Sequence, residues 1–170
     1  ASEYDWFHVP EEKRTGWMEE ALEHALQICA EKGLWEEATD AYTMERMKRI
    51  GQRTAWALME QLRKGNFAPE KTEVSFRNLE QLPGVSVLFP ADERLRLKGR
   101  IDRVDICREQ GNVYVRVIDY KSGSTRFDLT SVYYGLQLQL AVYLNAAMDM
   151  ESREGGEVHP AGMFYYHIER

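Results

Sequence analysis

The chain has 170 residues, of which 44% are hydrophobic, and this is enough to build one globular domain around an apolar core. The formal net charge of −6 excludes nucleic-acid binding through bulk charge, so contact with a polyanion would require a local basic patch, a bound cation or a partner subunit. The two cysteines, Cys29 and Cys107, exclude a disulfide framework and indicate a reducing compartment. We expect no signal peptide and no membrane span, and the start at Ala1 rather than Met indicates a piece of a longer protein.

Two long helices are predicted in the first part of the chain. Over 11–32 the apolar residues recur at helical spacing, and Gly33 would end the helix. A stronger helical period runs over 40–64 and ends before Gly65 and Pro69. The other face of this second helix is basic, and we interpret it as a solvated face in preference to a stripe that faces DNA. Its cations are Arg46, Lys48, Arg49, Arg53, Arg63 and Lys64.

The hydrophobic period then changes to the alternation that is typical of strands. Strands are predicted at 71–77, 85–89 and 93–109. Gly99 lies within the third of these, where a bulge or a close approach of another group is expected. Residues 110–112 indicate a hairpin turn into a further strand at 113–121. The third and fourth strands should therefore form an antiparallel pair.

A third helix and a last strand complete the predicted order. Asp128 or Thr130 can cap a helix that runs to about residue 148, and a polar loop at 151–160 precedes a strand at 161–168. We predict a single α/β domain of the α+β type over 1–170. It would consist of a helical lead-in at 1–66 and a core of strands, helix and strand at 67–170.

Two of the predicted strands carry an acidic residue within an otherwise apolar alternation. Residues i and i+2 of a strand point to the same face, so Asp119 and Lys121 should project side by side, and the hairpin would bring Asp102 next to them. Two carboxylates and an ammonium are the minimum for a metal-assisted hydrolase. An isolated Asp-x-Lys on a strand is usually a surface ion pair, but an acidic strand one hairpin upstream favours a site.

The residue types favour phosphodiester hydrolysis among the possible hydrolytic reactions. Carboxylate oxygens are preferred ligands of Mg²⁺, and Lys121 could orient or deprotonate a water, or stabilise charge on a phosphate. No Ser or Cys lies in a nucleophile motif, which disfavours peptide and ester hydrolysis. Gln139 and Tyr143 are four residues apart and share one helix face, from which they could hold a phosphate or a base near the metal.

The three motifs together resemble the RecB-type nucleases of the PD-(D/E)xK superfamily. They are Gly-x-Ile-Asp at 99–102, Asp-Tyr-Lys at 119–121 and Gln-x-x-x-Tyr at 139–143. The residues around the last motif and the segment 160–168 are similar to the AddB family, whose members are subunits of bacterial helicase–nucleases. The resemblance extends from about Met44 to Ile168.

This resemblance implies a fold, a cofactor and a partner. The fold would be a restriction-endonuclease-like core with a mixed sheet flanked by helices. The activity would be Mg²⁺- or Mn²⁺-dependent exonuclease cleavage of a DNA strand as it leaves a helicase, during the processing of double-strand ends for recombinational repair in the bacterial cytoplasm. An AddA-like subunit would be the partner. By the same resemblance, Asp102 and Asp119 become metal ligands and Lys121 the catalytic lysine, and Gln139 and Tyr143 contact DNA.

Two features depart from the family pattern. RecB-type nucleases usually supply a further metal ligand, a His in a Gly-x-x-x-His motif, and neither His8 nor His24 has that context. We expect this ligand upstream of Ala1, with His24 and Glu73 as weaker candidates.

The second departure concerns a 4Fe–4S cluster, which AddB proteins carry on four cysteines. We expect that cluster in the parent protein and not in these residues, and we interpret Cys29 and Cys107 as buried thiols. The alternative to a nuclease is a module with the same fold that acts as a scaffold or DNA channel, with weak or absent chemistry.

Overall fold

The computed structural model describes residues 7–32, 37–79, 97–123, 126–135 and 137–168. These residues fall into two compact units, one formed by the helices up to Asn66 and one that runs from Phe67 to His167. The two units are described separately below. Within the described ranges, no helix has the length and apolar character that crossing a bilayer would require.

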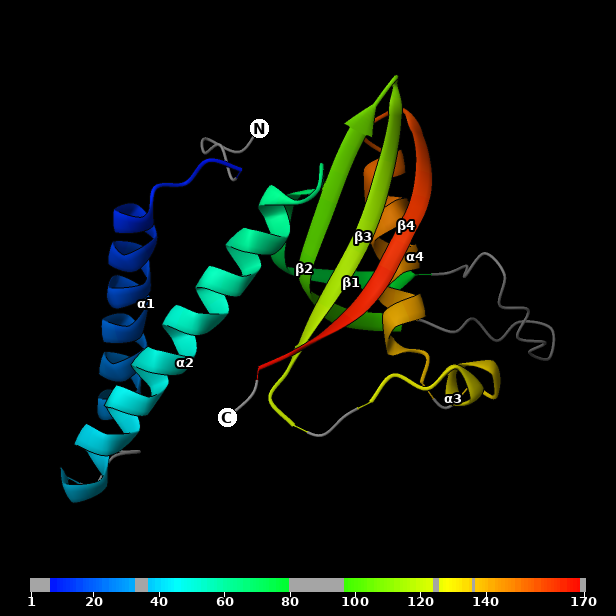
Figure 1. The fold of residues 1–170 in the computed structure, drawn as a ribbon. Coiled ribbons are helices and arrows are strands. Elements are labelled where there is room, and N and C mark those ends of the chain that lie inside the picture. Colours follow the sequence, from blue (N-terminus) through cyan, green and yellow to red (C-terminus); the bar gives the residue numbers. More distant parts are fainter. Residues whose placement is uncertain (1–6, 33–36, 80–96, 124–125, 136, 169–170) are drawn as a thin grey trace. The chain divides into compact units, whose positions relative to one another are not determined.

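The helical unit consists of α1 (Glu11–Glu31) and α2 (Glu37–Arg63), which pack against each other (Figure 1). Both helices agree with the prediction, and α2 begins three residues earlier than its hydrophobic period indicates. The helices approach closely where Gly51 faces Met18, because a Cβ at Gly51 would lie 2.9 Å from the Met18 sulfur. The arginines on the basic face of α2, Arg46, Arg49 and Arg53, are exposed, as a solvated face requires.

The second unit is built on a four-stranded mixed sheet with the strand order β1-β2-β3-β4 (Figure 1). Its strands are β1 (Ala68–Leu79), β2 (Leu97–Glu109), β3 (Asn112–Lys121) and β4 (Glu157–His167). The pairs β1–β2 and β2–β3 are antiparallel, whereas β3–β4 is parallel. Helix α4 (Gln139–Ser152) lies between β3 and β4 in the chain and packs on one face of the sheet. The predicted mixed sheet with flanking helices is confirmed.

The core lies between this sheet face and α4. On β2 and β3 one set of apolar residues alternates with period two, which places this set on the face toward the helix. Ala146 and Ala147 on α4 are buried there, and their small side chains let the helix approach the sheet. The core residues from these strands and from the first turn of α4 are Val104, Ile106, Val113, Val115, Val117 and Leu140.

The predicted hairpin between the two acidic strands is confirmed. Gln110 and Gly111 have φ values of +51° and +85°, which is the backbone that a two-residue type I′ turn needs. The ladder then pairs Glu109 with Asn112 and continues to Arg103 opposite Ile118. The predicted strand at 85–89 and the first part of that at 93–109 lie outside the described residues.

Two predicted boundaries are wrong. The helix expected from residue 128 to 148 is broken into α3 (Leu129–Tyr133) and α4, because Gly135 has a φ of +75° that turns the chain between them. Asp128 does cap α3, as predicted. The last strand begins at Glu157 and not at 161, since 157–160 pair with the start of β3.

Candidate active site

The acidic residues lie on the paired strands β2 and β3, on the face that α4 covers. The ladder between these strands ends with Arg103 opposite Ile118, and Asp102 and Asp119 directly adjoin this last pair. Asp102 Oδ2 accepts a hydrogen bond of 2.8 Å from the backbone N–H of Tyr120. The side chain of Asp102 is therefore tied to the strand that carries Asp119, and the structure brings the two carboxylates to one place.

Asp119 and Lys121 form an ion pair next to Asp102. The Lys121 Nζ lies 2.5 Å from Asp119 Oδ2, and the Asp119 side chain is almost completely buried. Burial lowers the pKa of Lys121, but the close contact with Asp119 and its charge outweigh this effect and leave the pKa above its usual value. Lys121 is therefore an ammonium ion held beside a buried carboxylate.

Helix α4 contributes the next two residues of the same group. The Lys121 ammonium donates to Gln139 Oε1 at 3.2 Å, and Gln139 Nε2 donates to the Tyr143 hydroxyl at 2.9 Å. Gln139 and Tyr143 are four residues apart in α4 and share a face, as their spacing predicts. The structure thus joins all five predicted site residues in one array, from the carboxylates on the sheet to Tyr143 on the helix. We call these five residues the catalytic array, after the role that the sequence predicts for them.

Gly99 makes room for the far end of the catalytic array. A Cβ at this position would lie 2.7 Å from two atoms of the Phe76 ring and 3.2 Å from the Tyr143 ring. The two rings contact each other edge to face, with centroids 5.9 Å apart. The glycine of the Gly-x-Ile-Asp motif is therefore required by the close packing of Phe76, which in turn supports Tyr143.

Three residues near the catalytic array carry no signal in the sequence. The parallel pairing of β4 with β3 places Tyr165 opposite Asp119 and His167 opposite Lys121. The Lys121 ammonium lies 5.4 Å from the centre of the Tyr165 ring, and Phe127 packs edge to face against that ring with centroids 6.2 Å apart. No motif marks these residues, because only the register of the parallel pair brings Tyr165 and His167 to the site.

A buried ion-pair network on the same strands braces the opposite face of the sheet. Asp105 is completely buried and accepts hydrogen bonds of 2.6 and 2.8 Å from Arg103 and of 2.7 and 2.9 Å from Arg116. Burial lowers the pKa of Arg103, but the hydrogen bonds and charge of Asp105 outweigh it and raise that pKa. Arg103 also donates to the Tyr120 hydroxyl at 3.2 Å. Charges at positions 103, 105 and 116 thus hold together the strands whose other face carries the carboxylates.

Both weaker ligand candidates have exposed side chains. Glu73 has a φ of +52°, and its exposed carboxylate pairs with Arg100 at 2.8 Å. His24 is exposed on α1, in the helical unit.

The two cysteines differ in burial. Cys107 is buried as predicted, but Cys29 is only half-buried, so the expectation of two buried thiols is wrong for Cys29. The reason is that two packed helices enclose little volume. Most described side chains of α1 remain at least partly exposed.

The two carboxylates fit a divalent metal of the magnesium type. Asp119 Oδ2 is buried, and within the described residues it contacts a cation, the Lys121 ammonium, at 2.5 Å. The site therefore already accommodates positive charge next to a buried carboxylate, as a metal site requires. No group of three or more His, Cys, Asp or Glu side chains gathers within the described ranges. Mg²⁺ often binds through one or two protein carboxylates and retains waters, so this donor set suits it.

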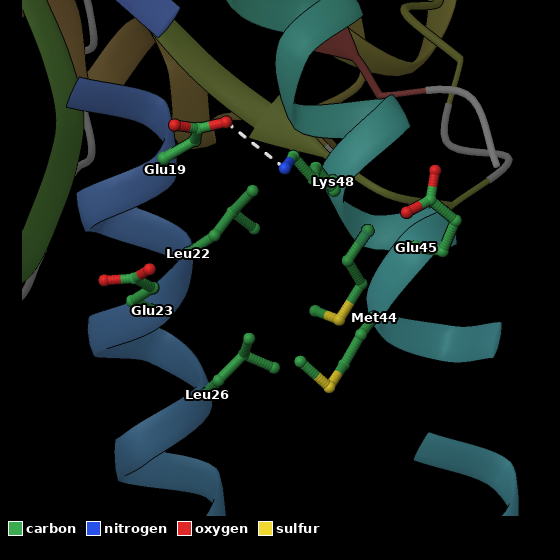
Figure 2. Close-up of a pocket in the computed structure, with 8 residues that line it drawn as sticks. Glu19, Leu22, Glu23, Leu26, Met44, Glu45 and Lys48 are labelled. Atoms are coloured by element: carbon green, nitrogen blue, oxygen red, sulfur yellow. Dashed lines mark ion pairs between the residues drawn. The ribbon is translucent and has the colours of Figure 1, made fainter. Parts of the chain in front are cut away.

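A separate pocket of about 520 Å³ lies between α1 and α2 in the helical unit, and Figure 2 shows its lining. Leucine and methionine side chains make up its apolar part, and three glutamates line it as well, while Lys48 pairs with Glu19 across it at 3.2 Å. An acidic lining disfavours a polyanion. The pocket therefore does not compete with the catalytic array as a site for phosphodiester chemistry.

Comparison with known proteins assigns the family. The sequence model of the PD-(D/E)XK nuclease superfamily matches residues 5–170. The chain is 43% identical, over 96% of its length, to an ATP-dependent helicase/deoxyribonuclease subunit of Lachnoclostridium phytofermentans. It is 44% identical over 75% of its length to the protein of the same name from Alkaliphilus oremlandii, and 37% identical over 98% to that from Alkaliphilus metalliredigens.

The chain spans 13%, 11% and 15% of the length of these three relatives. The match to the family covers nearly the whole chain and includes both acidic strands and α4. The resemblance predicted from the three motifs is confirmed, and the chain belongs to the PD-(D/E)XK nuclease superfamily.

Proposed function

We propose that this chain is the nuclease domain of a helicase–deoxyribonuclease and that it hydrolyses phosphodiester bonds of DNA. One observation carries the proposal. The buried Asp119 carboxylate lies 2.5 Å from the Lys121 ammonium, and Asp102 accepts a hydrogen bond from the backbone N–H of Tyr120, which lies between these two residues. The names of the relatives, which include a deoxyribonuclease function, support DNA as the substrate.

The residues of the catalytic array divide the work of the reaction among them. Asp102 and Asp119 would hold Mg²⁺ or Mn²⁺, which when bound supplies an activated water and stabilises negative charge on the phosphate. Lys121, as an ammonium ion, would donate to a phosphate oxygen and stabilise the charge that develops there. Gln139 accepts from Lys121 and fixes the direction of the ammonium. Tyr143 positions Gln139 and offers its hydroxyl toward the bound strand.

The parent protein gives this chemistry its context. We propose one nuclease domain over 1–170, with a helical lead-in at 1–66 and the catalytic core at 67–170. It would act as an Mg²⁺-dependent exonuclease on a strand delivered by the helicase, in the processing of double-strand ends for recombinational repair. An AddA-like subunit would be its partner, a 4Fe–4S cluster would lie elsewhere in the parent protein, and the site of action would be the bacterial cytoplasm, where the DNA is.

A second candidate function is a scaffold or DNA channel with the same fold. The observation that favours it is the donor set, because two carboxylates gather at the site and no third ligand joins them within the described part of the chain. A weakly held metal would then leave DNA binding without efficient cleavage.

A nuclease assay on the intact helicase–nuclease separates the two candidates. Asp119→Asn keeps the size of the side chain and removes its charge, and we expect DNA cleavage in Mg²⁺ to fall by about a hundredfold or more. Asp149→Asn is the matched control, because Asp149 is a residue of α4 whose carboxylate forms an exposed pair with Arg153. Cleavage at the wild-type rate by Asp119→Asn would contradict the catalytic assignment, and a wild-type complex that binds DNA but does not cleave it would favour the scaffold.

A further inference from the structure

Two adjacent tyrosines in the segment that leads from β3 to α4 are almost fully exposed. Tyr133 and Tyr134 expose 84% and 71% of their surface, and their rings contact each other edge to face with centroids 5.3 Å apart. Phe127, on the other side of α3 in the chain, is also exposed. Exposed aromatic side chains in a group mark a binding surface more often than an inert one. We name Phe127, Tyr133 and Tyr134 the aromatic platform.

The backbone under the aromatic platform is held firmly. Asp128 accepts hydrogen bonds from the backbone N–H groups of Thr130 and Ser131 and from the Ser131 hydroxyl. The Gln137 side chain accepts from the N–H of Asp128 and donates to the carbonyl of Arg126, at 3.1 and 3.0 Å. These contacts join the two ends of the turn that contains α3. The aromatic rings are therefore presented on a fixed support, which lowers the entropic cost of binding.

Phe127 links the aromatic platform to the catalytic array. Phe127 packs on Tyr165, and the Tyr165 ring faces the Lys121 ammonium at 5.4 Å. At the other end of the turn, Tyr134 precedes by five residues Gln139, which accepts a hydrogen bond from Lys121. Ring contacts thus lead from Phe127 to Lys121, and the two tyrosines lie close to Gln139 in the chain.

The segment between β3 and α4 is less acidic than the chain as a whole. Although the chain as a whole has a net charge of −6, the residues 122–138 contain one acidic side chain, Asp128, and one basic side chain, Arg126. The oxygens of Asp128 are occupied by the hydrogen bonds that cap α3. A strand of DNA that leaves the catalytic array along this turn would therefore pass no free carboxylate of the segment.

We propose that the aromatic platform binds single-stranded DNA by stacking bases on Tyr133 and Tyr134, and so fixes the strand beside the cleavage site. This inference rests on the proposed function and adds to it a subsite at Tyr133 and Tyr134, which would hold the strand through base faces and not through sequence. Every base has a face that can stack, so an aromatic pair binds any sequence. An ammonium with two carboxylates supplies no base contact of its own, and the aromatic platform provides it.

Photocrosslinking tests the proposal without relying on cleavage. The intact helicase–nuclease is irradiated in EDTA with single-stranded oligonucleotides that carry 5-iodo-deoxyuridine at successive positions, and the crosslinked peptides are mapped by mass spectrometry. We expect crosslinks at Tyr133 or Tyr134. Their absence at every position, with crosslinks formed elsewhere on the protein, would overturn the proposal. Because EDTA removes the metal, this result does not depend on whether the proposed nuclease chemistry is correct.

Kinetics with paired variants supply the energetic test. Tyr133→Ala combined with Tyr134→Ala should raise KM for single-stranded DNA by about fivefold or more with little change in kcat, because each stacked base contributes that much to binding. The double change to Phe keeps both rings and should leave KM near the wild-type value. Leu129→Ala is the matched control, since Leu129 is an equally exposed (72%) aliphatic residue of α3.

Two kinetic outcomes would overturn the proposal. One is an unchanged KM in the double Ala variant. The other is equal damage from the Phe and Ala changes, which would indicate a role for the hydroxyl groups and not for stacking. Loss of the partner subunit from the double Ala variant during gel filtration would also overturn it, because the tyrosines would then form a protein interface. A wild-type complex without any nuclease activity would contradict the proposed function but leave the crosslinking result interpretable.

Discussion

The substitution Gly99→Ala tests how the fold supports the candidate site. Gly99 lies in β2, three residues before Asp102, and it faces the rings of Phe76 and Tyr143. An added Cβ would lie 2.7 Å from two Phe76 ring atoms, far inside the normal contact distance. Phe76 is buried and cannot swing away into solvent. The ring can yield only by pressing on Tyr143, which lies 3.2 Å from the same Cβ position.

The size of the effect follows from two opposing contributions. Overpacking a core site by one methyl group costs about 1–3 kcal/mol, while replacing Gly by Ala stabilises by about 0.4–1 kcal/mol through the unfolded chain. We therefore expect a net loss of about 1–2 kcal/mol, which corresponds to a change of about 5- to 30-fold in a folding equilibrium. Displacement of Tyr143 would also break its hydrogen bond to Gln139, and a shift of this kind at a catalytic group can lower the rate by up to about a hundredfold.

Amide hydrogen exchange of the parent protein measures the local effect directly. Peptides from β1, β2 and α4 should exchange about 5- to 30-fold faster in the Gly99→Ala variant, and DNA cleavage should fall in the same protein. Gly123→Ala is the control, because a Cβ at Gly123 meets nothing within 4 Å and the change should be nearly neutral. Unchanged exchange in β2 together with a normal cleavage rate would show that the close packing at Gly99 does not support the site.

Three further predictions follow from the same structure. Asp105→Ala removes the carboxylate that pairs with the buried Arg103 and the partly buried Arg116, and it should destabilise the sheet by about 3–5 kcal/mol. Arg153→Ala breaks an exposed pair and should cost less than about 1 kcal/mol. Hydrogen exchange of β2 and α4 compares the two variants, and equal protection would contradict the bracing role of Asp105. Hydrogen bonds from Ser131 and Thr130 lower the pKa of Asp128. The cap that Asp128 forms therefore stabilises α3 fully at pH values above the ordinary Asp pKa, and this stabilisation is lost as the pH falls through the lowered pKa of Asp128. NMR titration of the wild type and of Asp128→Ala should show this loss, and α3 signals that do not change with pH would contradict it. Gly135 has a φ of +75°, so Gly135→Ala should strain the turn before α4 by about 1–2 kcal/mol. We expect this strain to raise KM for DNA, and a normal KM in the variant would contradict the prediction.

The catalytic array can be predicted from the sequence because its signals are local. Asp119 and Lys121 share a face through the period of a strand, and Gln139 and Tyr143 share one through the period of a helix. A single turn at Gln110 and Gly111 then fixes the antiparallel register that adds Asp102. Each step spans only a few residues, so propensity and pattern are sufficient.

The remainder depends on long-range pairing that the pattern does not encode. Tyr165 and His167 reach the site only through the parallel register of β4 with β3. The residues 151–160 are rich in Gly and charged side chains, which predicts a polar loop, yet 157–160 gain their order from pairing with β3. Arg116 and Asp105 resemble ordinary charges in alternating strands, and their mutual burial follows from the tertiary fold alone.

The break between α3 and α4 is the clearest case of a local signal that is outweighed. The apolar spacing from residue 129 to 148 is helical throughout, and it predicts one continuous helix. Gly135, however, adopts a left-handed conformation that costs glycine little, and the side chain of Gln137 stabilises the resulting turn through two hydrogen bonds. A single glycine and one side-chain contact across the turn thus override the period.

The claim on which the account depends most is that Asp102 and Asp119 together bind a divalent cation beside Lys121. Anomalous scattering from Mn²⁺ soaked into crystals of the parent protein tests this directly, with Asp119→Ala crystals treated in the same way as the control. We predict one strong anomalous peak in contact with both carboxylates in the wild type, and no peak at that position in the variant. A wild-type crystal without a peak between these two side chains, or a peak that persists after Asp119 is removed, would contradict the assignment of the metal site.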